Sequence, residues 1–256
     1  MIDERLIEKV VRYLKNAESI LFITGAGIST ESGLPTYRGV GGIYEDAVTK
    51  DGMSIEEALA GTTMDERPDI TWKHLYQLEK NCRGAQYNRA HKIMAEMEYE
   101  FERIWILTQN IDGFHHAAGS KNIIDIHGDM HKLRCTRCPY RLTVDNYAKL
   151  DVPPLCPECQ SIIRPDVVLF GEMLPVEKCQ LLHRELQVGF DIVFSVGTTS
   201  VFPYIAQPVI VAKYNGIPTV EINPGMTEVS HIVDVKIPAG ACAAFELLWK
   251  RYKNDH

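Results

Sequence analysis

Apolar residues occur along this chain in two kinds of run. After Asp3 they recur at helical spacing, which predicts an amphipathic helix with apolar positions Leu6, Ile7, Val10, Val11 and Leu14. Unbroken apolar runs are typical of strands covered on both faces, and they occur at 19–24, 104–108, 122–126, 167–170, 191–196, 219–222 and 233–237. Helical patterns at 88–98 and 203–214 lie between some of them. This alternation predicts an α/β protein with a doubly wound, mostly parallel sheet.

Two stretches interrupt the alternation. Residues 39–87 open with Gly39-Val-Gly-Gly42 and continue as polar, helix-like sequence, and residues 131–164 contain four closely spaced cysteines. We interpret both as insertions that pack together as a small second domain, with a helical module and a metal module. The large domain would then consist of 1–38, 88–130 and 165–256.

Composition narrows the class of protein. The chain has 256 residues, 45% hydrophobic and 24% charged, which is ordinary for a globular protein. Its formal net charge of −7 disfavours nucleic-acid binding. The N-terminus does not resemble a signal peptide, and we find no apolar run long enough to span a membrane. The odd number of cysteines, seven, together with metal-type spacing indicates a reducing compartment, so we expect a cytoplasmic protein. We also expect a monomer.

The four cysteines form two Cys-x2-Cys pairs, with seventeen residues between the pairs: Cys135, Cys138, Cys156 and Cys159. Such spacing is typical of a four-cysteine zinc site, whereas four unconnected buried thiols are the simpler alternative. Four thiolates leave no open position on a tetrahedral ion. The pattern therefore predicts a structural zinc ion.

A glycine-rich turn, Gly25-Ala26-Gly27, directly follows the first predicted strand. Rossmann-like folds place their phosphate-binding turn there, ahead of a helix N-terminus that offers N–H groups. Thr30 stands where a third glycine is usual, so an ordinary tight turn remains the alternative. Arg38 follows closely and could pair with a phosphate, and Tyr37 could cover a flat or reactive group. The simpler alternative is a solvated arginine beside an aromatic residue of the core.

Polar side chains follow two other predicted strands. Gln109-Asn110-Ile111-Asp112 comes after one, and His127-Gly128 after another. Because ligands bind outside the carboxyl ends of parallel strands, both groups should face one cleft. The amides and the carboxylate suit a carboxamide or ribose hydroxyls. His127 is suited to act as a general base, although a lone histidine is more often structural.

Together these motifs resemble the sirtuins, which are NAD-dependent protein-lysine deacylases. Seven motifs occur in family order between about residues 20 and 242: 25–29 with 35–38, 108–112, 126–128, the four cysteines, 167–172, 197–200 and 221–223. The resemblance implies a Rossmann-like NAD-binding domain, a smaller zinc-binding domain with one structural zinc ion, NAD as co-substrate and acyl-lysine proteins or peptides as partners.

The resemblance also implies roles for individual residues. His127 would activate a ribose hydroxyl as the catalytic base, with Asn110 assisting at the nicotinamide. The cofactor-binding set would be Gly25, Ala26, Gly27, Ser29, Thr36, Tyr37, Arg38, Gln109, Asn110, Ile111, Asp112, Gly197, Thr198, Thr199, Ser200, Asn223 and Cys242. An acyl-lysine peptide would add as an extra strand beside Val167, Val168, Phe170, Gly171 and Glu172.

Acyl preference is partly readable from the resemblance. Sirtuins that prefer acidic acyl groups carry a Tyr-x-x-Arg pair in the small domain, and Leu75 and Leu78 stand at those positions here. An apolar pair favours acetyl or longer neutral acyl groups. Two alternatives remain: a protein ADP-ribosyltransferase on the same scaffold, disfavoured by the presence of His127, and a non-catalytic zinc-ribbon binding module, disfavoured by the acidic charge and the cleft residues.

Overall fold

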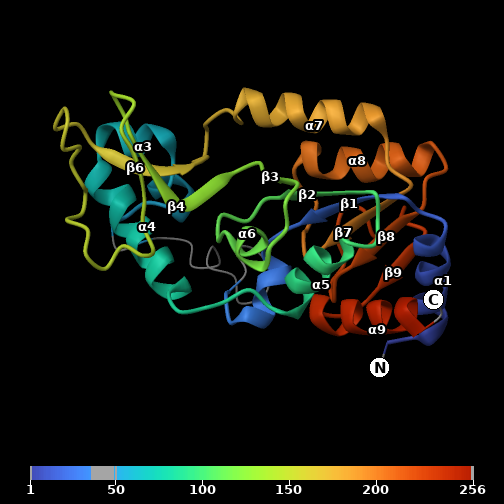
Figure 1. The fold of residues 1–256 in the computed structure, drawn as a ribbon. Coiled ribbons are helices and arrows are strands. Elements are labelled where there is room, and N and C mark those ends of the chain that lie inside the picture. The colour runs from blue at the N-terminus through green and yellow to red at the C-terminus, as the bar shows by residue number, and fades with distance from the viewer. Residues whose placement is uncertain (1, 36–48, 50, 255–256) are drawn as a thin grey trace.

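A computed structural model describes residues 2–35, 49 and 51–254 (Figure 1). The first helix, α1 (Glu4–Lys15), begins where the Asp3 carboxylate accepts a hydrogen bond from the backbone N–H of Arg5. Its apolar face is buried, as the helical spacing predicted. Within the described ranges, no helix combines the length and the apolar character needed to cross a membrane.

The large sheet is parallel throughout. Its order is β3 (Ile123–Asp125), β2 (Arg103–Thr108), β1 (Ser19–Thr24), β7 (Ile192–Val196), β8 (Thr219–Ile222) and β9 (Val235–Ile237). The predicted α/β class is confirmed. The direction of chain order reverses between β1 and β7, which makes their carboxyl ends the topological switch point where such folds bind ligands.

Helices cover both faces of this sheet (Figure 1). On one face α1, α5 (Arg89–Met97) and α9 (Ala241–Asn254) pack around Phe22, Phe194 and Phe245. On the other face lie α7 (Val176–Val188) and α8 (Pro203–Tyr214). Two short segments, η1 (Ala26–Ser32) and α6 (Phe114–Ala118), follow β1 and β2 at the carboxyl edge.

A second hydrophobic core lies beside the edge of the large sheet, on the left in Figure 1. It combines α2 (Ile55–Ala58), α3 (Gly61–Glu66) and α4 (Pro68–Cys82) with an antiparallel sheet of order β5 (Arg141–Thr143), β4 (Gly128–Cys135), β6 (Ile163–Val167). Trp72 of α4 packs edge-on against Tyr147, and its indole N–H donates to the carbonyl of Ile163 over 2.9 Å. Residues from both insertions therefore share one core.

One predicted strand was placed wrongly. The apolar run at 167–170 was expected among the strands of the parallel sheet, but β6 ends at Val167 and pairs with β4 in the small sheet. The residues after Val167 bond elsewhere: the N–H of Val168 donates to the carbonyl of His127, and that of Phe170 to the carbonyl of Leu59, over 2.9 and 3.0 Å. This segment connects the carboxyl edge of the large sheet with the second core.

Candidate active site

A cavity of about 740 Å³ opens at the switch point between the two cores. One side is formed by the segments that follow β1, β2, β7 and β8, namely 25–27, 109–111, 197–199 and 223–227. The other side is formed by the second core through Leu59, Leu75, Leu78 and residues 167–172. The volume lies within the range typical of pockets for small molecules.

The glycine turn packs backbone against backbone with the loop after β7. The N–H groups of Gly25 and Gly27 donate to the carbonyls of Val196 and Gly197 over 3.1 and 2.8 Å. A Cβ on Gly27 would lie 2.7 Å from the Cα of Gly197, and Gly197 itself has a φ of +59°. The glycines are thus required by the contact between two cavity-lining loops. The helix expected after the turn is instead a 3-10 segment, η1.

The segment after β2 forms a connected polar network. Asn110 is only 5% exposed, and its amide donates to the Gly25 carbonyl over 3.1 Å and to Ser29 Oγ over 3.3 Å. Ser29 Oγ in turn donates to Asp112 Oδ2 over 2.8 Å, while Asp112 Oδ1 accepts from the N–H of Phe114. Burial raises the pKa of Asp112. Asn110 therefore lines the cavity, and Ser29 and Asp112 lie behind it as its support.

His127 has both ring nitrogens engaged. Its Nδ1 lies 3.0 Å from the carbonyl oxygen of Gln109, and its Nε2 lies 2.6 Å from the hydroxyl of Tyr204. A carbonyl can only accept, so Nδ1 carries the proton in the neutral ring and Nε2 holds the lone pair. Burial lowers the pKa of His127, and the positive charge of Lys178 lowers it further. The side chain thus lines the cavity as a neutral imidazole whose basic nitrogen is Nε2.

The residues assigned by resemblance to the adenosine side divide into two groups. Gly197, Thr198, Thr199 and Asn223 line the cavity. Ser200 and Cys242 do not: Ser200 is buried beside Ser195, and the backbone N–H of Cys242 donates to Glu31 over 2.8 Å. Three further predicted cofactor residues lie outside the described residues: Thr36, Tyr37 and Arg38.

Every residue predicted to meet the substrate lines the cavity: Val167, Val168, Phe170, Gly171, Glu172, Leu75 and Leu78. Glu172 forms a two-pronged ion pair with the buried guanidinium of Arg164, at 2.5 and 3.0 Å. Its Oε2 also accepts from the N–H of Leu169 over 2.9 Å. These contacts make Glu172 an anchor for the 167–172 segment.

Sequence reasoning missed part of the lining. Pro224, Gly225, Met226 and Thr227 follow Asn223 after β8. Asn223 was assigned by the resemblance to sirtuins, and the rule that ligands bind beyond the carboxyl ends of parallel strands was not applied to this strand. Phe202 and Tyr204, at the start of α8, gave no sequence signal that links them to His127. The remaining members that were not anticipated are Thr30, Leu59, Leu169, Leu174, Ile222, Ala239, Gly240 and Ala241.

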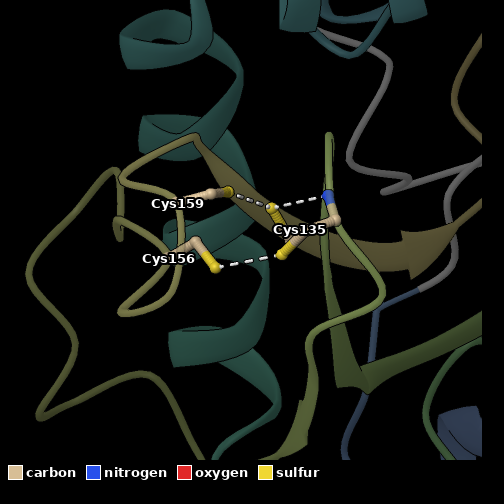
Figure 2. A group of neighbouring side chains, drawn as sticks. Cys135, Cys156 and Cys159 are labelled. Carbon is tan, nitrogen blue, oxygen red and sulfur yellow. Dashed lines mark hydrogen bonds between the residues drawn. The ribbon is translucent and has the colours of Figure 1, made fainter.

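The four cysteines come together at one end of the small sheet, where Cys135 is the last residue of β4; Figure 2 labels Cys135, Cys156 and Cys159. Their sulfur atoms all lie within 4.8 Å of one another, with 3.4 Å between Cys135 and Cys159 and 3.5 Å between Cys138 and Cys156. Sulfurs around a tetrahedral zinc ion are about 3.8 Å apart, whereas a disulfide needs about 2 Å. The N–H groups of Arg137 and Cys138 donate to Cys135 Sγ. The cluster fits zinc.

The cysteine cluster is separate from the cavity. Cys135 ends the strand that begins at Gly128, directly after His127. Seven residues of extended chain span roughly 20 Å. A metal ion held there would brace the second core without reaching His127.

The fold and the cavity define a doubly wound α/β protein with a ligand site at its switch point and a metal module beside it. Residues 25–203 match the model of the Sir2 family. The NAD-dependent protein deacylase 2 of Pseudomonas aeruginosa is 45% identical over 92% of this chain and 93% of its own, and the NAD-dependent protein deacylase of Thermococcus sibiricus is 35% identical over 97% of each. The chain belongs to the Sir2 family, which confirms the resemblance to sirtuins.

Solved structures agree with this assignment. A complex of a Sir2 homologue with NAD has a TM-score of 0.86 and 31% identity over 97% of this chain and 94% of that one. A complex of a Sir2 protein with a deacetylated p53 peptide and 3′-O-acetyl ADP-ribose has a TM-score of 0.86 and 27% identity over 96% and 98%. The likeness extends over both cores.

Proposed function

We propose that this protein is an NAD-dependent protein-lysine deacylase, which transfers the acyl group of a modified lysine to ADP-ribose and releases nicotinamide. The observation that carries the proposal is the position of His127, whose basic Nε2 lies in the cavity between the carboxyl edge of the large sheet and the 167–172 segment. The names of the Pseudomonas and Thermococcus relatives support it.

The residues on the sheet side of the cavity fit NAD. Close backbone approach holds the loop of Gly25 and Gly27 against that of Gly197, and both loops line the cavity without a bulky side chain at these glycines, which suits a pyrophosphate. Asn110, held by Gly25 and Ser29, is suited to the nicotinamide carboxamide. Bound NAD supplies the electrophilic ribose carbon at which nicotinamide leaves. His127 then removes a proton from a ribose hydroxyl at Nε2.

The other side of the cavity suits an acyl-lysine in extended conformation. In the described small sheet β6 is an edge strand, but the N–H and carbonyl of Ile163 already bond to Pro154 and Trp72, so the peptide would add beside the segment 167–172, which lines the cavity. Leu75 and Leu78 form part of the apolar wall, and no lysine or arginine occurs among the described residues that line the cavity. Acidic acyl groups would lack a charge partner there. The arrangement favours acetyl or longer neutral groups.

The remaining assignments are proposals as well. The cysteine cluster holds one structural zinc ion, and the chain divides into a large domain (1–38, 88–130 and 165–256) and a small one (39–87 and 131–164). The seven cysteines support a cytoplasmic location, and the net charge of −7 supports a protein that does not bind nucleic acid. We propose a monomer as well. Protein partners would be recognised by their acyl-lysine.

The test is a panel of acetyl, long-chain acyl and succinyl-lysine peptides incubated with and without NAD. Mass spectrometry should find free lysine and O-acyl-ADP-ribose, and only with NAD. His127→Ala should keep NAD binding by calorimetry and lose at least about 100-fold in turnover. His183→Ala, an exposed histidine of α7, is the matched control.

Each outcome of this panel is informative. Retained turnover in His127→Ala would reject the assigned base. ADP-ribose attached to protein, without loss of acyl groups, would identify a transferase instead. Desuccinylation faster than deacetylation would reject the acyl preference.

A further inference from the structure

Tyr204 contacts the proposed base directly. Its hydroxyl lies 2.6 Å from His127 Nε2, and its ring stands at 81° to the imidazole. The ring is held in place because Phe202 stacks on it at 5.5 Å with an interplanar angle of 15°. Tyr204 is the second residue of α8, after Pro203. A rigid aromatic pair at a helix start therefore presents one hydroxyl to the catalytic nitrogen.

The direction of this hydrogen bond follows from the other side of the ring. The Gln109 carbonyl accepts from Nδ1–H, so Nε2 of the neutral ring can only accept, and the Tyr204 hydroxyl must donate. Burial raises the pKa of Tyr204 to about 12, which keeps the phenol protonated at neutral pH. In the neutral ring the hydroxyl donates to the Nε2 lone pair; only after protonation of the ring, with the hydroxyl turned, could the same oxygen accept from Nε2–H.

We infer that Tyr204 is a positioning residue: it holds His127 as the neutral base, with the lone pair on Nε2, until the substrate hydroxyl takes its place. This inference rests on the proposed function, in which that hydroxyl belongs to a ribose. Gln109, directly after β2, then bonds to Nδ1, and Tyr204, at the start of α8, bonds to Nε2, so the ring is held from both sides of the switch point.

Other groups near the ring are charged or titratable, and the test must separate them from Tyr204. Lys178 of α7 acts on His127 through its positive charge, and its ammonium pairs with Asp125 over 2.7 Å. Cys179, on α7 as well, acts electrostatically on Tyr204 and raises its pKa. None of these changes when the Tyr204 hydroxyl alone is removed. Tyr204→Phe is therefore the variant to use.

The matched control is Tyr214→Phe, the same substitution at the end of the same helix, where the side chain is 86% exposed. Each protein, labelled with ¹⁵N-histidine and free of substrate, would be titrated by NMR. The His127 signal would be identified by its disappearance in His127→Asn. Loss of this hydrogen bond should change the pKa of His127 by about 0.5–1 unit in Tyr204→Phe and leave it unchanged in Tyr214→Phe.

An unchanged His127 pKa in Tyr204→Phe, or an equal shift in Tyr214→Phe, would overturn the inference while leaving the deacylase proposal intact. The acid limb of kcat/KM, which reports the free enzyme, should move by the same amount as the NMR value. A limb that stays in place while the NMR pKa moves would show that His127 is not the base, and would overturn the proposed function instead.

Discussion

The cysteine cluster and the cleft both gather functional side chains, but over very different distances along the chain. Cys135 and Cys159 are 24 residues apart. In the cleft, His127 meets Tyr204 across 77 residues, Asn110 meets Gly25 across 85, and Gln109 meets Thr198 across 89. The first site needs two short hairpin-like segments, whereas the second needs β1, β2 and β7 to be neighbours in the large sheet.

This difference predicts two modes of failure. The second core is small, and its cysteine end depends on ligands that repel one another as thiolates unless an ion neutralises them. The cleft depends on close backbone contacts that belong to the large sheet itself. Damage to the cluster should therefore unfold one region, whereas damage to the cleft loops should affect binding and global stability together.

The largest effect should come from the cluster. Cys156→Ser removes a fully buried ligand, so the protein should lose its zinc. The second core should then be strongly destabilised, because structural zinc contributes about 10–16 kcal/mol in small zinc-binding peptides. Zinc content by mass spectrometry and urea unfolding followed by tryptophan fluorescence would measure this. Cys179→Ser, outside the cluster, is the matched control. A zinc-free protein with full activity and unchanged unfolding would contradict a bracing role.

The next largest effect should come from the loop after β7. Gly197→Ala places a Cβ 2.3 Å from the N atom of Ile28 at a φ of +59°, so both clash and backbone strain oppose folding. We expect a loss of about 2–4 kcal/mol in the free energy of unfolding, together with weaker NAD binding. Denaturant unfolding and calorimetry would measure the two effects.

Gly216→Ala separates the two causes. Gly216 has a φ of +72°, but no atom lies within 4 Å of the point where its Cβ would stand, so only strain of about 1–2 kcal/mol should appear, with NAD binding intact. If the two variants were equally destabilised and bound NAD alike, the close approach of Gly27 and Gly197 would not matter to the cleft.

The sequence predicted the cysteine cluster more completely than the cleft, because the cluster joins residues that are close along the chain and the cleft joins residues that are far apart. Cysteine spacing almost determines a tetrahedral cluster, and apolar runs determined which segments form the buried strands. The run at 167–170 was misassigned because an apolar run carries no information about its pairing partner. The residues after β1, β2 and β3 were predictable because parallel strands share one carboxyl edge, whereas those after β7 and β8 were assigned through the resemblance to sirtuins.

What could not be predicted depends on distances between elements. Nothing local indicates that Tyr204 reaches His127, since this depends on where α8, which packs against β7 and β8, lies relative to the residues after β3. Likewise, Ser29 and Asp112 carry the motif of a binding site, yet their hydrogen bond to one another holds them behind Asn110. The sequence motifs predicted which segments lie at the cavity. Which of their side chains line it depends on how the segments pack against one another.

The smallest expected effect is the pH dependence of the free energy of unfolding, which we expect to come from two buried histidines, His91 and His115. His91 and His115 are 0% and 2% exposed, with ring centroids 4.8 Å apart. His115 Nε2 lies 2.9 Å from Thr24 Oγ1 at the end of β1, and His91 belongs to the capping box of α5 with Asn88. Burial lowers the pKa of His91 to about 4 and that of His115 well below its ordinary 6.5.

Because both folded pKa values lie below the unfolded value, the unfolded chain binds more protons as the pH falls. The folded state therefore has its full stability with respect to these two histidines above about pH 6.5, and its free energy of unfolding declines as the pH falls toward their folded pKa values. Between pH 7.5 and 5.5 the free energy of unfolding should fall by about 2–3 kcal/mol for the pair. Urea titrations at the two pH values, followed by far-UV circular dichroism, would measure it.

His91→Gln tests the source of this pH dependence. Glutamine does not titrate and suits the third position of a capping box, so the helix start is preserved. The variant should lose about half as much stability between the two pH values as the unsubstituted protein, whereas His231→Gln, at an exposed site, should behave like that protein. If the unsubstituted protein, His91→Gln and His231→Gln all lost the same stability between the two pH values, His91 would not be a source of the acid sensitivity. The acid sensitivity would then arise away from the cleft.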